Sequence, residues 1–203
     1  MSKLITYLKK SRLAMLLRKP CRKVFCRLAD AGLSSSNPLW FSRDSTGIVH
    51  VGAHAGQEAW IYVAFGKPVI WIEPNPIVMT LLREIIRKYP KQQAVQALIT
   101  DRSNVETAFH ISNCHGGSSS IFDLGGHQQM YPGVIYEQTI PIRSTTLDDA
   151  LSRIPGSSRQ NALVMDVQGA EVVVPRGATK SLRQFKWFFA ECADFEIYRN
   201  GCT

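Results

Sequence analysis

Two short segments of the sequence combine residues whose types and spacing suit the binding of a nucleoside. In His50–Glu58, Gly52 and Gly56 permit a tight turn between an apolar run and a predicted helix, with close backbone approach to a ligand. Glu73 ends the next apolar run, 21 residues after Gly52. A carboxylate at that place can accept hydrogen bonds from both hydroxyls of a ribose. The two segments together predict a site for a nucleoside-containing cofactor.

A second acid, Asp166, directly follows another apolar run, Ala162–Met165. We expect it at the carboxyl edge of the same sheet, where ligands bind. Both acids also have a structural interpretation, because a carboxylate at the end of a strand can cap the helix that follows. For Glu73 the ligand interpretation is favoured, since Asn75 already suits the capping position.

A long loop rich in Gly, Ser and His, from His115 to His127, adds candidates for contact with a substrate. Such a loop inside a compact domain is usually functional or disordered. His127 has a reference pKa of about 6.5, which suits a base, although a loop histidine without a role is the commoner case. His50 and His54 lie four residues apart in a strand-to-loop turn rather than on one helix face, so we expect no metal site.

Short apolar runs must form the strands that position these residues. Their continuous rather than alternating apolarity indicates strands buried on both faces, as in a parallel sheet covered by helices. The predicted strands are Ile48–Val51, Val69–Ile72, Ala94–Ile99, Ala162–Met165 and Trp187–Ala190. Helices are predicted over 57–65 and after Asn75-Pro76, where Asn75 caps and Pro76 suits the first position. Between the third and fourth runs, Val105–Ile111 and Gln138–Arg143 are expected to form a hairpin-like excursion.

The positive charge of the chain belongs to its first segment. Residues 1–30 hold nine Lys and Arg and one acid, which leaves 15 bases and 15 acids for the rest of the 203 residues. A basic nucleic-acid-binding domain is therefore not expected. We divide the chain into a basic helical extension (1–33), a linker (34–46) and one domain (47–203). The extension is interpreted either as a helix for weak contact with a membrane surface or a partner, or as a solvated helix packed on the domain.

Cysteine usage indicates a reducing compartment. The five cysteines include no CxxC pair, and their odd number and scattered spacing argue against a disulfide framework. We expect reduced thiols in a cytoplasmic protein. No apolar run approaches the length of about 20 residues that a membrane span requires.

Six ordered motifs give the chain a resemblance to a known family. In this order they read IVHVGAHAGQE, VIWIEPNP, ALITD, SSSI, STTLDDAL and LVMDVQGAE. Together, over about residues 47–201, they resemble the FkbM-type methyltransferases, which are class I, Rossmann-like enzymes that use S-adenosylmethionine. The resemblance implies a doubly wound, mostly parallel sheet and methyl transfer to a hydroxyl oxygen of a glycan or secondary metabolite.

The resemblance also assigns roles to individual positions. The turn would face the methionine part of the cofactor, Glu73 would hold the ribose, and the residues after the third strand would lie near the adenine. The residues so assigned to the cofactor are Gly52, Ala53, His54, Gly56, Glu73, Asn75, Thr100 and Asp101. Asp166 would sit beside the transferring methyl group, and Asp166 and His127 are the candidate catalytic bases. The acceptor would meet the loop that contains Ser118, Ser119 and Ser120.

Two departures from the family pattern affect the expected activity. Pro175 falls where the family has a helix, and a proline deep in a helix costs about 3 kcal/mol. Only twelve residues follow Glu191, so we expect a truncated domain that lacks the final helix and β-hairpin. Trp187–Ala190 would then form an edge that favours self-association. The alternatives are a cofactor-binding remnant without turnover and, less favoured because the full G-x-G-x-x-G spacing is missing, a nicotinamide-dependent oxidoreductase.

Overall fold

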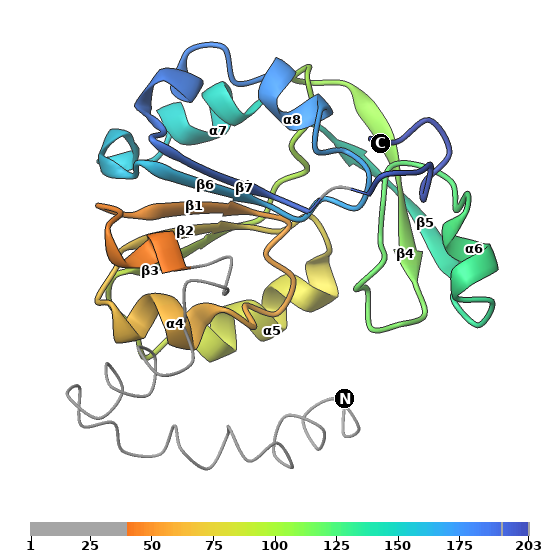
Figure 1. The fold of residues 1–203 in the computed structure, drawn as a ribbon, viewed down its shortest axis with the longest axis horizontal. Helices are drawn as coiled ribbons and strands as arrows, with labels where there is room; N and C mark the ends of the chain where they lie inside the picture. Colours follow the sequence, from red (N-terminus) through yellow and green to blue (C-terminus); the bar gives the residue numbers. More distant parts are fainter. Residues whose placement is uncertain (1–39, 192, 203) are drawn as a thin grey trace. The chain divides into compact units, whose positions relative to one another are not determined.

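The fold is described from a computed structural model, which covers residues 40–191 and 193–202 (Figure 1). Apart from Trp40, these residues belong to one compact unit, Phe41–Thr203. The predicted basic extension (1–33) and residues 34–39 of the predicted linker lie outside the described residues. The rest of that linker forms the short 3-10 helix η1, Trp40–Arg43, and a turn in which the Ser45 carbonyl accepts a hydrogen bond from Lys67 Nζ at 2.6 Å.

A five-stranded parallel sheet forms the centre of this unit, in the order β3-β2-β1-β6-β7. Every residue of β1, β2 and β6 is buried, as continuous apolar runs predict. The strands are β1 Ile48–Val51, β2 Val69–Ile72, β3 Gln92–Val95, β6 Ala162–Met165 and β7 Trp187–Ala190. Four of the five have the bounds predicted from the sequence. The expected doubly wound, mostly parallel α/β fold is confirmed.

The third strand lies earlier in the chain than predicted. β3 begins at Gln92, which pairs with Val69 of β2, and it ends at Val95. Leu98 and Ile99 gave the predicted strand its apolar end, but both are buried outside the sheet. Ile99 bridges to Thr145 and joins the main core, and Leu98 packs in a smaller cluster with Phe109. The apolar residues at the end of this run are therefore buried without pairing as part of a strand of the sheet.

Helices cover both faces of the sheet, with α4 and α5 on one side and α7 and α8 on the other (Figure 1). The predicted capping of α5 is confirmed, because Asn75 Oδ1 accepts from the amides of Ile77 at 3.0 Å and Val78 at 3.4 Å, and Pro76 occupies the first turn. The helices are α4 Ala59–Ala64, α5 Pro76–Ile86, α7 Leu147–Ser152 and α8 Val173–Arg176, with 3-10 helices η2 Ser157–Arg159 and η3 Ser181–Gln184. None of the helices in the described ranges is long and apolar enough to cross a membrane.

Helix α8 has only four residues, and this explains how it accommodates Pro175. The proline lies in the first turn, where the backbone amide that it lacks would have no helical partner. Val174 beside it is fully buried in the main core. The expected conflict between Pro175 and a helix at this place therefore does not arise.

The predicted excursion is a separate antiparallel pair of strands, β4 (Glu106–Ser112) and β5 (Tyr136–Arg143). It lies beside the sheet together with the short helix α6 (His127–Met130) (Figure 1). Residues of β4 and of the loop that follows it line a pocket with the carboxyl ends of the central strands. The excursion thus closes the edge at which the predicted cofactor residues lie.

His50, in the middle of β1, is a buried core residue. Its ring stacks on Trp71 with centroids 5.0 Å apart, and its Nδ1 lies 3.3 Å from the Tyr62 hydroxyl. The imidazole thus fills a space between β1, β2 and α4 and points to no pocket described below.

Candidate functional site

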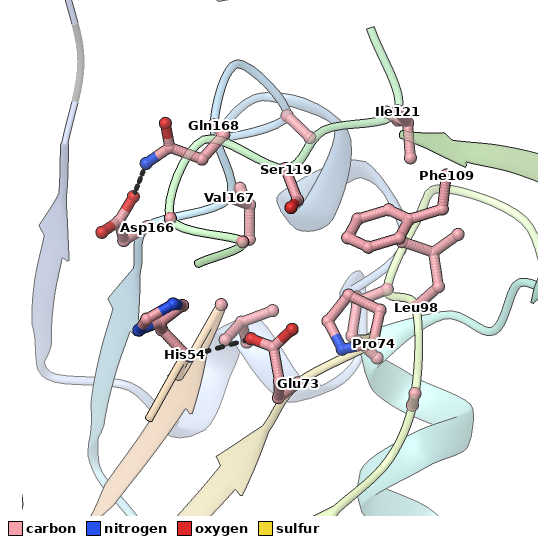
Figure 2. Close-up of a pocket in the computed structure, with 17 residues that line it drawn as sticks. His54, Glu73, Pro74, Leu98, Phe109, Ser119, Ile121, Asp166, Val167 and Gln168 are labelled. Atoms are coloured by element: carbon pink, nitrogen blue, oxygen red, sulfur yellow. Dashed lines mark hydrogen bonds between the residues drawn. The ribbon is translucent and has the colours of Figure 1, made fainter. Parts of the chain in front are cut away.

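A pocket opens at the carboxyl edge of the sheet (Figure 2). Glu73 and Asp166 reach it from the ends of β2 and β6, on either side of β1. Figure 2 shows an apolar wall across from them, made by Leu98, Phe109 and Ile121. A mostly apolar pocket with a few convergent polar groups is the usual form of a small-molecule site.

The Glu73 carboxylate is buried and held by two backbone amides. Its side chain is 6% exposed. Oε2 accepts from the amide of His54 at 2.8 Å and Oε1 from that of Asn75 at 2.8 Å. Burial raises the pKa of Glu73 to about 7, against the two amide hydrogen bonds, and Asp166 raises it further. Each carboxylate oxygen accepts more than one hydrogen bond, so Glu73 can still accept from a ligand. Asn75, not Glu73, caps the helix.

The glycine turn packs closely against the loop that carries Asp166. Gly52 has a φ of 78°, and a Cβ there would overlap the carbonyl oxygen of Asp166. The amides of Gly52 and Ala53 both donate to the Ile72 carbonyl, at 2.9 and 3.0 Å. These two amides are therefore already paired within the protein and are not free to donate to a ligand. Gly52 and His54 line the pocket, whereas Ala53 and Gly56 do not.

Asp166 lies in a tight loop directly after β6. Its amide donates to the Val51 carbonyl at 3.0 Å, and its Oδ1 accepts from the Gln168 side chain (Figure 2). Burial raises the pKa of Asp166 to about 6, and the neighbouring carboxylates of Glu191, Glu171 and Glu58 raise it too. A carboxylate with that pKa is mostly ionised at pH 7 and is suited to accept a proton there. It caps no helix, since the residue before α8 is Val172.

Glu171 organises the Asp166 loop, a role that sequence reasoning missed. The buried Glu171 Oε1 accepts from the amides of Val167 at 3.1 Å and Gly169 at 3.2 Å. The signal was present, because Glu171 ends the motif that begins at Leu163. A carboxylate five residues after the strand-end acid can fold back on the amides between them.

Thr100 and Asp101, predicted near the adenine, do not line the pocket. Thr100 is buried, with its amide donating to the Thr145 carbonyl at 2.9 Å and its hydroxyl to the Arg102 carbonyl at 2.9 Å. Asp101 is exposed. The neighbouring segment 97–99 lines the pocket instead. The chain leaves the sheet at Val95, earlier than predicted, and this brings the apolar residues to the pocket in place of Thr100 and Asp101.

The serine loop and His127, both predicted to contact the acceptor, line two different cavities. Ser119 lines the same pocket as Glu73, and Ser120 donates to the Gln168 carbonyl at 2.6 Å, which ties the serine loop to the Asp166 loop. Ser118 is anchored by its amide, which donates to Ser112 Oγ at 3.1 Å. His127 instead lines a second, neighbouring cavity. Asp166 lines both cavities, so the structure brings the two candidate bases to a shared space.

Comparisons with known proteins identify the family of the chain. The model of the Methyltransferase FkbM domain matches residues 50–201. The chain is also 28% identical over 160 residues to the 2-O-methyltransferase NoeI of Sinorhizobium fredii, across 74% of this chain and 65% of that relative. The chain thus spans less than two thirds of the relative's length. With a family match over most of its length and the parallel sheet described above, the chain belongs to the FkbM methyltransferase family.

Proposed function

We propose that this chain binds S-adenosylmethionine and transfers its methyl group to a hydroxyl oxygen of a sugar or related metabolite. The observation that carries the proposal is Glu73, a buried carboxylate at the end of β2 that is fixed by two amides and faces a pocket. A carboxylate at that place in a doubly wound sheet is suited to both hydroxyls of a ribose. The activity in the printed name of the relative, a 2-O-methyltransferase, supports an oxygen acceptor.

The pocket residues fit the rest of such a cofactor. The apolar wall of Leu98, Phe109 and Ile121 offers a surface for a flat base. The carboxylate of Asp166 lies on the other side, where a positive sulfonium is stabilised by charge. Gly52 and His54 between them are placed to contact the amino-acid part.

In the proposed mechanism the protein supplies position and a base. When bound, the cofactor supplies an activated methyl group. With the cofactor held by Glu73 and the apolar wall, the acceptor oxygen would take up the methyl group, and the electron pair of the carbon–sulfur bond would remain on sulfur. The hydroxyl proton passes to the Asp166 carboxylate and then to water. Asp166 has the better location for this role because it lines both cavities, and His127 is the second candidate.

The first experiment separates this proposal from the alternatives. Calorimetry with S-adenosylmethionine, its demethylated product and NAD on the full chain should give binding of the first two only. Glu73→Ala should weaken that binding about tenfold or more, since a hydrogen bond to a charged group contributes about 1.5–3 kcal/mol. Binding of NAD alone would support the oxidoreductase, and unchanged affinity in a folded Glu73→Ala protein would remove the ribose assignment. Cofactor binding without transfer to any hydroxylated metabolite would support the inactive remnant.

A further inference from the structure

A second cavity lies next to the pocket of Glu73. The two share Asp166 and Gln168 in their linings. A group bound in the second cavity would therefore lie next to Asp166, on the side opposite the methyl group of the proposed cofactor. We call this space the acceptor cavity and define it by His127, Tyr131, Asp166, Glu171, Glu191 and Tyr198.

The walls of the acceptor cavity are tied together by hydrogen bonds between distant parts of the chain. The Ile197 carbonyl accepts from the amides of Gly125 at 3.0 Å and His127 at 2.9 Å. On the other side, the Tyr198 hydroxyl donates to Gln168 Oε1 at 2.5 Å. A Cβ at Gly169 would lie 2.9 Å from that of Tyr198, so the tyrosine packs directly on the Asp166 loop. The cavity is thus a built feature of the fold.

Aromatic rings form one side of the acceptor cavity. The His127 ring lies between Tyr131 and Tyr198, with centroids 5.1 and 5.4 Å away. Tyr131 is 54% exposed and stands at the rim. Aromatic faces beside a polar space offer an apolar contact for a ring that carries polar substituents at its edges.

The polar groups of the acceptor cavity are acceptors of hydrogen bonds. Three carboxylates, of Asp166, Glu171 and Glu191, line it, and its lining among the described residues includes no Lys or Arg. Glu191 lies close enough to raise the pKa values of Asp166 and Glu171, and Glu171 also raises that of Asp166. Burial lowers the pKa of His127, which keeps the imidazole neutral at pH 7. The cavity is therefore negative and repels anions.

The histidine of the acceptor cavity carries one buried nitrogen without a partner. His127 is 7% exposed, and its Nδ1 has no hydrogen-bond partner among the residues that the structure describes. Buried polar atoms are almost always paired in folded proteins. Nδ1 itself is closed to solvent, so a hydroxyl-bearing ligand would reach it only after the imidazole ring turned toward the cavity.

We propose that the acceptor cavity binds a sugar ring without anionic substituents, and that Glu191 is the residue that rejects anionic ones. This assignment rests on the proposed function. The sugar hydroxyls donate to the carboxylates, the C–H face of the ring lies on Tyr131, and the reacting hydroxyl meets Asp166. An anionic substituent would lie among carboxylates with no cation to pair it.

The test uses the full chain, radiolabelled S-adenosylmethionine, and matched pairs of neutral methyl glycosides and their uronates. We expect methylation of a neutral glycoside with a kcat/KM about tenfold or more above that of its uronate, a gap that narrows at high salt. Glu191→Lys should raise the relative kcat/KM for the uronate several-fold and move the acid limb of the pH–rate profile to lower pH, because it removes a carboxylate near Asp166. Glu84→Lys, an equal charge change on the exposed surface of α5, is the control and should change neither.

A second variant keeps the test decisive if Glu191→Lys does not fold. Tyr131→Ala removes an exposed ring and should raise the KM for the neutral glycoside with an unchanged cofactor Kd. Equal rates on glycoside and uronate, or an unchanged KM in Tyr131→Ala, would overturn the acceptor assignment. So would normal cofactor binding with no neutral glycoside methylated, a result that leaves the proposed cofactor site standing. If the unmodified protein did not bind S-adenosylmethionine at all, the proposed function itself would be refuted.

Discussion

Binding of S-adenosylmethionine should release protons from Glu73, and the pKa of Glu73 sets the amount. With that pKa at about 7, about half of the cofactor-free molecules carry a protonated Glu73 at pH 7. Ribose hydroxyls that donate to the carboxylate favour its ionised form, so the bound cofactor lowers this pKa. We therefore expect release of about half a proton per cofactor at pH 7 and almost none at pH 9. Asp166, with a pKa of about 6, adds only about a tenth of a proton at pH 7.

Calorimetry in two buffers of different ionisation enthalpy measures this release directly. The observed binding enthalpy should change with the buffer at pH 7 and not at pH 9. In Glu73→Gln the release at pH 7 should fall to the roughly one tenth of a proton that Asp166 contributes, and the affinity should fall as well. Equal proton release in the wild type and in Glu73→Gln would show that another group contacts the ribose.

Four further results are expected. Asp166→Asn should lower the methylation rate about 100-fold or more, a much larger effect than its weakening of cofactor binding, and the wild-type rate should fall about tenfold per unit below pH 6; equal rates would shift the base to His127. Gly52→Ala should lower the denaturant midpoint of unfolding clearly, because its Cβ overlaps the Asp166 carbonyl; an unchanged midpoint would contradict that packing. Deletion of residues 1–33 should leave cofactor binding intact and abolish sedimentation with anionic vesicles at low salt; the extension has no membrane role if the full chain does not sediment either. Phe188→Lys, at an apolar position of β7 that is 53% exposed, should reduce self-association in light scattering; a full chain that is already monomeric would refute the exposed-edge argument.

The strands of this fold were predictable because most of them are buried on both sides. Val69–Ile72 and Ala162–Met165 are fully buried, and their apolar runs begin and end where the pairing does. The third strand was not, because Gln92 and Gln93 pair with β2 although they are polar, while Leu98 and Ile99 are apolar for other contacts. An apolar pattern in the sequence predicts which residues are buried. Whether those residues also pair in a sheet depends on neighbouring strands that lie elsewhere in the sequence.

Part of the candidate site was also predictable from the sequence, and part was not. Glu73 and Asp166 were predicted to lie at the carboxyl edge from their positions after strands, and both line the pocket there. The acceptor cavity was not predictable, because its walls join residues near 125 to residues near 197 through backbone hydrogen bonds. Nothing in the local sequence at either place encodes that contact. His127 was singled out by residue type alone, without the neighbours that give its position meaning.

The buried His50 sets a limit on how acidic a solution the fold tolerates. Burial lowers its pKa to about 3 from a reference value of 6.5, so between these pH values the unfolded chain binds a proton that the folded chain does not. Stability present above pH 6.5 is thus lost as the pH falls, by about 2 kcal/mol at pH 5.

Glu73 acts in the opposite direction. Its raised pKa means that between about pH 4.5 and 7 the folded chain holds a proton that the unfolded chain has released, so this contribution to stability grows as the pH falls. Between about pH 4.5 and 6.5, the contributions of His50 and Glu73 to the pH dependence of stability are opposite in sign and cancel. A bound ribose keeps Glu73 ionised and removes the compensation. The cofactor-loaded protein, although more stable at neutral pH, should therefore lose stability more steeply on acidification than the empty one.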